Sequence, residues 1–202
     1  MYNYSSVSRE VLEALEKYQS LTLKWNKAIN LVSCNTKNDF WVRHILDSLQ
    51  LMKYINDQNI HLIDVGSGGG FPGIVLSIAG IKNVILVESD VRKSVFLLQA
   101  FKISSNKINV VNQRIESVKL DCDILTSRAC TQLDKILAYT KHINVRNKYL
   151  LFKGEKYQQE IEIAKKRWSF CHSIYDSETS NIVNSGEVGD VVTSRRLPTI
   201  TN

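Results

Sequence analysis

Hydrophobic residues recur at every third or fourth position between residues 7 and 29, which predicts an amphipathic helix. A second helix is predicted from Thr36 to about Tyr54, because Thr36 and Asp39 have the spacing of a capping box. Its apolar side contains Phe40, Trp41, Ile45, Leu49 and Met52. We expect these two helices to form a helical N-terminal extension, residues 1–58, that packs on the rest of the chain.

From residue 59 onward, short apolar runs alternate with helical patterns. Strands are predicted at residues 62–65, 84–88, 108–111, 123–126, 149–152, 170–175 and 188–196. Helices are predicted after Pro72, after Asp90 with Val91, Val95, Leu98 and Phe101 inward, after a capping box at Thr131 and Asp134, and over residues 155–168. The pattern predicts a single compact α/β domain whose Rossmann-like core, residues 59–202, contains a doubly wound, mostly parallel seven-stranded sheet.

The first predicted strand leads directly into the glycine-rich turn Gly66-Ser-Gly-Gly-Gly70, and a helix follows. Such a turn lets the backbone approach a nucleotide closely. Gly66-x-Gly68-x-Gly70 is typical of an S-adenosylmethionine site, whereas Gly68-x-Gly70-x-x-Gly73 also satisfies the dinucleotide fingerprint. Phe71 occupies the place of the packing glycine in a dinucleotide site, so the turn favours a smaller ligand that packs against Phe71.

Chemically distinctive residues follow the carboxyl ends of several predicted strands, and these ends form one rim of a doubly wound sheet. They are Gly66–Phe71, Glu88, Ile115–Glu116, Ser127–Arg128 and Lys153–Gly154. Glu88 lies about 20 residues past the glycine turn, where an acid accepts hydrogen bonds from a ribose diol. Asp64, inside a strand, needs a partner, and we expect it to orient the turn or a ligand amino group.

The predicted second helix carries three ionisable residues, Arg43, His44 and Asp47, at helical spacing. In one interpretation Asp47 pairs with Arg43 one turn away and His44 is a core histidine. In the other, all three face a substrate. The sequence leaves both interpretations open.

With these residues in view, the chain resembles the bacterial 16S ribosomal RNA guanine-N7 methyltransferase G family, also called glucose-inhibited division protein B. The resemblance covers nearly the whole chain and rests on Lys24-Trp-Asn-Lys-Ala-Ile-Asn-Leu31, Trp41-Val-Arg-His-Ile-Leu-Asp-Ser-Leu49, Leu62-Ile-Asp-Val-Gly-Ser-Gly-Gly-Gly-Phe-Pro-Gly73, Ser127-Arg-Ala129 and Phe152-Lys-Gly154. The residues from Val191 to Pro198 depart from the family's basic C-terminal end, so no RNA contact is carried over to them.

The resemblance implies a class I methyltransferase that moves a methyl group from S-adenosylmethionine to guanine N7. It implies cofactor contacts from Gly66, Phe71, Ile115, Glu116 and Arg128. Position adds Asp64, Gly68 and Glu88 to this set. We predict catalytic roles for Arg128, Lys153, His44 and Asp47, and substrate contacts from Arg43, His44 and Lys153. No metal site is expected, because the cysteines are widely spaced.

Composition limits the partners. The net charge of +6 over 202 residues permits a nucleic-acid partner without proving one. The basic run Lys165-Lys166-Arg167 and the pair Arg195-Arg196 fit either phosphate contacts or a solvated surface. No signal peptide or membrane span is evident, so we expect a cytoplasmic monomer that acts on 16S rRNA or the small ribosomal subunit, with no membrane or DNA partner.

Three other functions share parts of this pattern. A methyltransferase acting on another RNA or a small molecule would keep the turn and Glu88, although a small-molecule enzyme would also need a lid over its pocket. An NAD-dependent oxidoreductase is disfavoured by Phe71 and by the lack of a second, catalytic domain. A non-catalytic RNA-binding protein is disfavoured because Asp64, the turn glycines and Glu88 are all intact.

Overall fold

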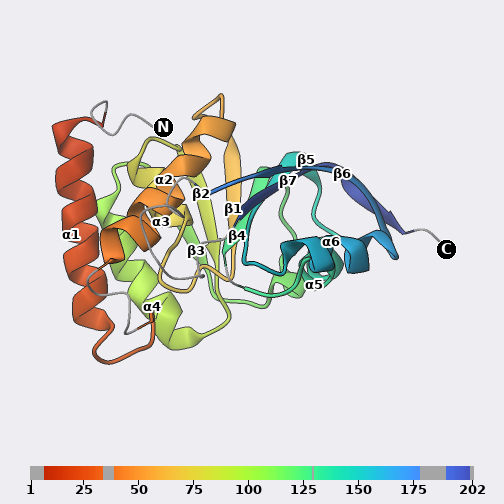
Figure 1. Ribbon diagram of the computed structural model, residues 1–202. Helices are drawn as coiled ribbons and strands as arrows, with labels where there is room; N and C mark the ends of the chain where they lie inside the picture. Colours follow the sequence, from red (N-terminus) through yellow and green to blue (C-terminus); the bar gives the residue numbers. More distant parts are fainter. Residues whose placement is uncertain (1–6, 34–38, 129, 178–189, 201–202) are drawn as a thin grey trace.

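A seven-stranded sheet forms the centre of the molecule in the computed structural model (Figure 1). The structure describes residues 7–33, 39–128 and 130–177, and the backbone of residues 190–200. The strands are β1 (His61–Val65), β2 (Asn83–Val87), β3 (Lys107–Val111), β4 (Cys122–Arg128), β5 (Val145–Lys153), β6 (Trp168–Tyr175) and β7 (Asp190–Ile200). Their order is β3-β2-β1-β4-β5-β7-β6.

The pairing of these strands confirms the predicted α/β fold. Strands β1 to β5 pair in parallel, whereas β7 pairs antiparallel with both β5 and β6. Parallel strands place their carboxyl ends at one edge, and that edge therefore carries the glycine turn after β1, Glu88 after β2 and Arg128 at the end of β4.

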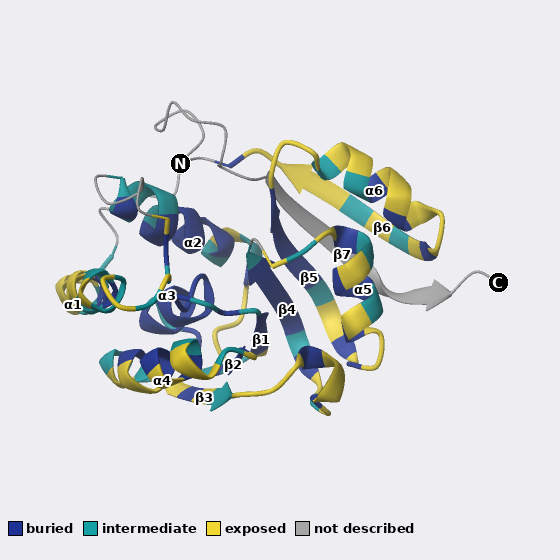
Figure 2. Cartoon of the chain, turned by 90° about the horizontal axis from the view of Figure 1, so that it is seen from below, coloured by how far each residue is buried: buried dark blue, intermediate teal, exposed yellow. Residues whose placement is uncertain are grey.

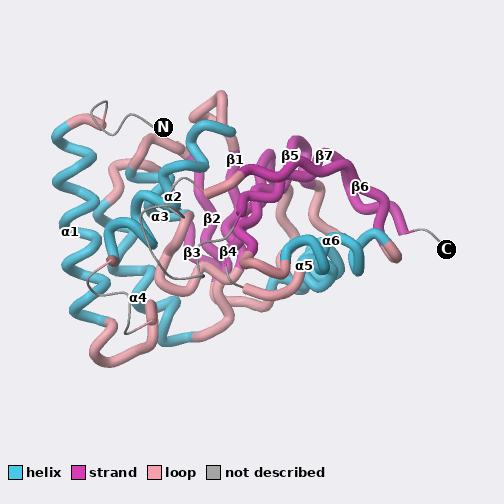
Figure 3. The backbone as a smooth tube through the Cα atoms, in the orientation of Figure 1, coloured by secondary structure: helices cyan, strands magenta, loops and turns pink. Residues whose placement is uncertain are grey.

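Helices cover both faces of the parallel strands (Figure 3). One face packs against α1 (Arg9–Trp25), α3 (Gly73–Ile78) and α4 (Val91–Ala100), and the other packs against α5 (Leu133–Thr140) and α6 (Tyr157–Lys165). Adjacent residues of one strand serve opposite faces: Leu62 belongs to the first core and Ile63 to the second. The central strands are accordingly buried between the two layers (Figure 2).

The N-terminal helix is shorter than the predicted span of residues 7–29. It begins at Arg9, where the Ser8 side chain caps it, and it ends at Trp25. The Asn26 carboxamide then accepts hydrogen bonds from the backbone N–H groups of Leu31 and Val32, which redirects the chain. Helix α1 buries Leu15 and Tyr18 against the core, as its period predicts.

The second predicted helix is described from Asp39 onward, and the cap residue Thr36 lies outside the described residues. It changes its hydrogen-bond pattern along its length. A π-helical stretch (Trp41–Leu46) is followed by α2 (Asp47–Leu49) and a 3₁₀ stretch (Gln50–Tyr54). A π-helical stretch is rare and is frequently found at functional sites.

The prediction for the inward face of α4 was wrong for three of its four residues. Val91, Val95 and Leu98 are exposed, at 64%, 44% and 45% of their surface, whereas Phe96 and Leu97 are fully buried. The fourth, Phe101, packs partly buried against the core. The helix has two apolar sides at helical spacing, and only tertiary packing selects the one that meets the sheet. The predicted cap is confirmed, because Asp90 Oδ1 accepts hydrogen bonds from the N–H groups of Arg92 and Lys93.

The capping box predicted at Thr131 is also wrong. Helix α5 begins at Leu133, and its N-cap is Gln132, which makes no side-chain capping bond. The carboxylate of Glu160 on α6 instead accepts a hydrogen bond of 2.7 Å from the Leu133 N–H. Asp134 is bound by the indole N–H of Trp168 at 2.8 Å. A side chain distant in sequence thus replaces the local cap.

Candidate functional site

The glycine turn has the positive φ angles that its glycine spacing predicts. Gly66, Gly68 and Gly70 have φ angles of +68°, +55° and +85°, in the left-handed region that favours glycine. The N–H groups of Gly66 and Ser67 donate to the Val87 carbonyl at 2.9 and 3.2 Å. These bonds tie the turn to the end of β2.

Glu88 touches this turn directly. Its Oε2 accepts a hydrogen bond of 2.9 Å from the Gly68 N–H, and its Oε1 accepts one of 2.8 Å from the Asp90 N–H. The carboxylate is 7% exposed. The turn and the acid that the sequence placed on one rim therefore do meet, which brings a hydrogen-bond acceptor to the mouth of the glycine turn.

A small cavity of about 80 Å³ lies beside the turn. Its wall contains Gly66, Ile115, Glu116, Cys130 and Tyr139. Ile115 and Glu116 were predicted to lie here. Cys130 and Tyr139 were not predicted to line this cavity. Tyr139 reaches it from α5, and no local signal in the sequence marks that residue. Ligand sites usually have roughly 300–1,000 Å³, so a nucleoside would extend beyond this cavity onto the rim.

Asp64 is completely buried at the base of the turn. Its Oδ2 accepts a hydrogen bond of 3.1 Å from the Gly73 N–H, whereas Oδ1 has no hydrogen-bond partner among the described residues. Burial raises the pKa of this carboxyl to about 7. A buried acceptor without a partner beside a glycine turn is suited to a cationic donor such as an ammonium group.

Arg128 contacts all three ionisable residues of the second predicted helix, Arg43, His44 and Asp47. Its Nη1 donates to the Arg43 carbonyl at 2.9 Å and lies 3.7 Å from Asp47 Oδ2. Its Nη2 lies 2.8 Å from His44 Nδ1, and its guanidinium carbon lies 4.9 Å from the centre of the Phe71 ring. We call Arg128, His44, Asp47 and Phe71 the arginine cluster.

Burial and the contact with Arg128 together set the protonation state of His44. Burial, followed by the positive charges of Arg128 and Arg43, lowers the pKa of His44 to about 2. The imidazole is therefore neutral. Because a guanidinium can only donate, Nδ1 is the acceptor and the ring proton is on Nε2. His44 is thus both a core histidine, packed 5.0 Å from the Phe71 ring, and a member of the cluster.

The helical spacing suggested an ion pair between Asp47 and Arg43, and each of these residues also has another partner. Arg43 Nε lies 3.5 Å from Asp39 Oδ2, one turn earlier, and Asp47 faces Arg128 on β4. Asp47 is 5% exposed. The carboxylate therefore links the helical segment to the sheet edge.

The Phe71 ring is enclosed by protein side chains. It is 3% exposed and lies 5.2 Å from the Tyr18 ring and 5.7 Å from the Phe40 ring. The Tyr18 hydroxyl donates a hydrogen bond to the Gly69 carbonyl, so α1 holds the glycine turn. Tyr18 lies on the apolar side of the predicted N-terminal helix, and the sequence does not single it out as a contact of the turn. The available signal was a tyrosine on an apolar helix face, whose hydroxyl needs a partner when buried.

Lys153 lies apart from the arginine cluster. Phe152 belongs to the core on the α1 side, and Lys153, the next residue of β5, points to the opposite face. Its Nζ lies 2.8 Å from Glu160 Oε2 and donates to the Thr131 carbonyl at 2.7 Å. The side chain is 4% exposed, and burial lowers its pKa. This arrangement fixes the loop after β4, and the catalytic and substrate roles of Lys153 stay predictions.

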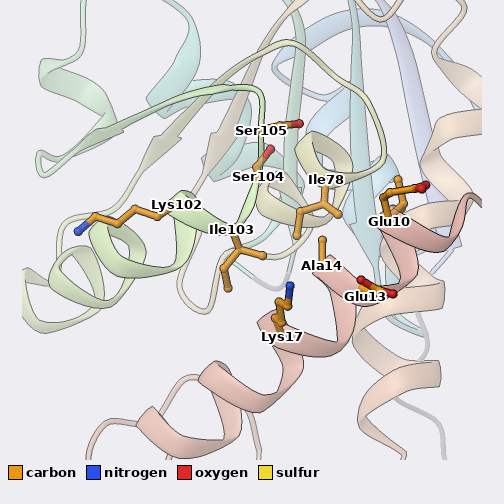
Figure 4. A pocket seen from close by; sticks show the side chains of 10 residues that line it. Glu10, Glu13, Ala14, Lys17, Ile78, Lys102, Ile103, Ser104 and Ser105 are labelled. Atoms are coloured by element: carbon orange, nitrogen blue, oxygen red, sulfur yellow. The ribbon is translucent and has the colours of Figure 1, made fainter.

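A larger hollow of about 500 Å³ lies between α1 and the segment after α4 (Figure 4). Residues of both charges surround it, including Glu13, Lys17 and Lys102, and none of the site residues above lines it. Within the described ranges, no three His, Cys, Asp or Glu side chains are grouped to hold a metal ion. No helix of those ranges is long and apolar enough to cross a membrane.

Comparison with known proteins supports one family. The family model described as rRNA small subunit methyltransferase G matches residues 11–186. The chain is 58% identical over 173 residues to the ribosomal RNA small subunit methyltransferase G of Rickettsia prowazekii, covering 86% of this chain and 91% of that protein. It is 53% identical over 185 residues to that of Rickettsia bellii, covering 92% and 96%.

Solved structures support the fold. The magnesium protoporphyrin IX methyltransferase of Synechocystis, solved with bound S-adenosylmethionine, has a TM-score of 0.61 at 14% identity and covers 95% of this chain and 99% of its own. The ribosomal protein L11 methylase of Lactobacillus delbrueckii has a TM-score of 0.55 at 14% identity, covering 75% and 77%. At these identities the likeness concerns the fold alone.

Proposed function

The chain belongs to the rRNA small subunit methyltransferase G family, and we propose that it transfers a methyl group from S-adenosylmethionine to N7 of a guanine in 16S rRNA. The observation that carries the proposal is the family match from residue 11 to 186, because the matched region contains both the glycine turn and Arg128. The family description supports small-subunit rRNA as the substrate, and the geometry of the glycine turn supports S-adenosylmethionine as the cofactor.

The residues around the glycine turn fit S-adenosylmethionine. Asp64 has a buried oxygen without a partner, suited to the cofactor's ammonium group. Glu88 offers a carboxylate beside Gly68, suited to a ribose diol. Ile115 and Glu116 line the cavity beside Gly66, suited to an adenine ring and its edge. When bound, the cofactor supplies an electrophilic methyl group on a positively charged sulfur.

The reaction asks for positioning more than for proton transfer. Guanine N7 carries a lone pair and no proton, so no general base is needed. The main task is to hold N7 in line with the methyl group at roughly 3–3.5 Å and to exclude water. Arg128 is the candidate substrate contact, because its buried ion pair with Asp47 and its contact with neutral His44 hold the guanidinium in one place at the rim.

The remaining assignments extend this proposal. The partner would be 16S rRNA, free or within the small ribosomal subunit, and such a substrate would place the protein in the cytoplasm. We propose separately that the protein acts as a monomer. The guanine would have to be unstacked to reach the rim, as is usual for sequence-specific RNA recognition. Arg43 and Lys153 stay candidate substrate contacts, although Lys153 would need to leave Glu160 to reach RNA.

The test is methyl transfer from labelled S-adenosylmethionine to small ribosomal subunits, and separately to protein-free 16S RNA, from cells that lack the activity. Label recovered as 7-methylguanine from one RNA fragment is the expected result. Glu88→Ala serves as the inactive control, and Glu162→Ala, on the exposed surface of α6, serves as the matched active control. Cofactor binding without transfer to either RNA would contradict the substrate and favour a small-molecule methyltransferase.

A further inference from the structure

We propose that Ser177 is a positioning residue: it fixes the carboxylate of Asp47 and, through Asp47, the guanidinium of Arg128. The inference concerns the same site as the proposed function and rests on that function for its kinetic readout. It assigns a role in the site to Ser177, which lies two residues after the end of β6.

The first observation is a closed ring of three buried side chains. Ser177 Oγ donates to Asp47 Oδ1 at 3.1 Å, and Gln50 Nε2 donates to the same oxygen at 2.7 Å. Gln50 Nε2 also donates to Ser177 Oγ at 3.1 Å, which closes the ring. Asp47, Gln50 and Ser177 are 5%, 2% and 2% exposed. In so buried and low-dielectric a setting each of these bonds is stronger than it would be in water.

The second observation is that the two carboxylate oxygens of Asp47 contact different partners. Oδ1 accepts from Ser177 and Gln50, whereas Oδ2 faces Arg128 Nη1 at 3.7 Å. A buried ion pair is favourable only when its geometry is good and the remaining lone pairs are satisfied. Ser177 and Gln50 satisfy Oδ1 and set the rotation of the carboxylate, and that rotation decides where Oδ2 meets the guanidinium.

The third observation is where these residues come from. Ser177 and Asp47 are 130 positions apart, and Ser177 follows shortly after the end of β6 at Tyr175. The Tyr175 ring also contacts the Tyr54 ring, with centres 4.6 Å apart, so the end of β6 is attached twice to the helical segment of residues 41–54. The antiparallel strands at the sheet edge are thereby connected to the arginine cluster.

The test compares Ser177→Ala with Ser173→Ala, the same substitution on an exposed residue of β6. With RNA and cofactor saturating, Ser177→Ala should lower kcat about tenfold, the size of one lost hydrogen bond to a charged group. Ser173→Ala should keep the wild-type kcat. The KM for S-adenosylmethionine should stay within about twofold in both, because the glycine turn is untouched. Ser177→Thr, which keeps the hydroxyl, should recover most of kcat.

A double-mutant cycle separates positioning from a general loss of structure. Asp47→Asn removes the charge through which Ser177 acts, so adding Ser177→Ala to Asp47→Asn should lower kcat by no more than about twofold. A full further tenfold loss in that background would overturn the proposal. Wild-type kcat in Ser177→Ala would also overturn it.

A second readout does not depend on activity. The contact with Asp47 is made by Nη1, so the Nη–H signals of Arg128 are the ones to follow in ¹⁵N-arginine-labelled protein, identified by their disappearance in Arg128→Lys. They should exchange faster with water in Ser177→Ala and not in Ser173→Ala. If the wild-type protein methylates no RNA, the proposed function fails while these signals still test the inference. Arg128 signals that are equally protected in all three proteins refute it.

Discussion

Oε2 of Glu88 accepts a hydrogen bond of 2.9 Å from the backbone N–H of Gly68, so the acid after β2 touches the turn after β1. Glu88→Ala would remove this acceptor and the acceptor of the Asp90 N–H together. We expect a loss of affinity for S-adenosylmethionine of about tenfold or more, since hydrogen bonds to charged groups contribute about 1.5–3 kcal/mol each. Calorimetric titration measures it, and unchanged affinity would remove Glu88 from the site.

A methyl group at Gly73 has no room. A Cβ there would lie 2.4 Å from Leu86 Cδ2 and 2.8 Å from Asp64 Oδ2. Gly73→Ala should therefore lower the free energy of unfolding by about 1–3 kcal/mol. Gly154→Ala is the matched control, because nothing lies within 4 Å of its Cβ. It should change stability by no more than about 0.5 kcal/mol. Urea denaturation of both variants checks the pair, and equal stabilities would contradict this packing.

The buried carboxyl of Asp64 gives stability a pH dependence. Its pKa is raised from 3.8 to about 7 by burial, so between these values the folded state binds more protons than the unfolded state. Its contribution to the free energy of unfolding is present at low pH and is lost as pH rises toward 7, by at most about 1.4 kcal/mol per pH unit. In urea titrations, Asp64→Asn should lose this slope relative to wild type. Parallel pH profiles would show that Asp64 is ionised throughout.

His44 acts in the opposite direction. Folding lowers its pKa from 6.5 to about 2, so below pH 6.5 the unfolded state binds a proton that the folded state does not bind. Its contribution is present above 6.5 and is lost as pH falls, again by at most about 1.4 kcal/mol per pH unit. His44→Asn keeps a neutral acceptor and should be less sensitive to acid than wild type. An NMR titration in which His44 has an ordinary pKa would refute this.

Arg128→Ala should abolish methyl transfer and also destabilise the fold. It would leave the buried carboxylate of Asp47 without its cation, at a cost of roughly 3–5 kcal/mol. Adding Asp47→Asn should recover part of the stability without recovering transfer, because the uncompensated charge is gone while the guanidinium is still missing. Thermal unfolding and transfer assays on the wild type, Arg128→Ala and the double variant separate the two effects. Wild-type transfer by Arg128→Ala would remove it from the site.

The face of α4 can be tested with neighbouring leucines. Leu97 is fully buried and Leu98 is 45% exposed. Leu97→Ala should cost about 2–5 kcal/mol, whereas Leu98→Ala should cost no more than about 1 kcal/mol. Chemical denaturation gives both numbers. A larger cost at Leu98 would restore the inward stripe that the sequence predicted.

Local patterns were sufficient where one short stretch defines an element. The apolar runs that became β1, β2 and β3, the Asp90 cap and the left-handed glycines of the turn are all set by residues a few positions apart. The meeting of Glu88 with the turn also follows from sequence, because parallel strands place their carboxyl ends on one edge. Alternation of strand and helix thus determined the fold class and the sheet edge at which the turn and Glu88 meet.

Other features depend on contacts between residues far apart in the chain, which no local pattern encodes. Helix α4 offered two apolar sides, and the sheet selected the one with Leu97. Glu160, not Thr131, receives the first N–H of α5. The Tyr18 hydroxyl on α1 binds the glycine turn. Arg128 pairs with Phe152 on β5, and Lys153, the next residue of β5, faces the opposite side of the sheet.

The sequence by itself determined the order of elements and the edge of the sheet that carries the glycine turn, because these follow from local period, turn geometry and chain direction, and its motifs identified the family. Only the tertiary structure decided which polar groups share the buried space at that edge. Burying Asp47, His44 and Arg128 is tolerable only if they satisfy one another, and Ser177, 130 residues away from Asp47, completes that set.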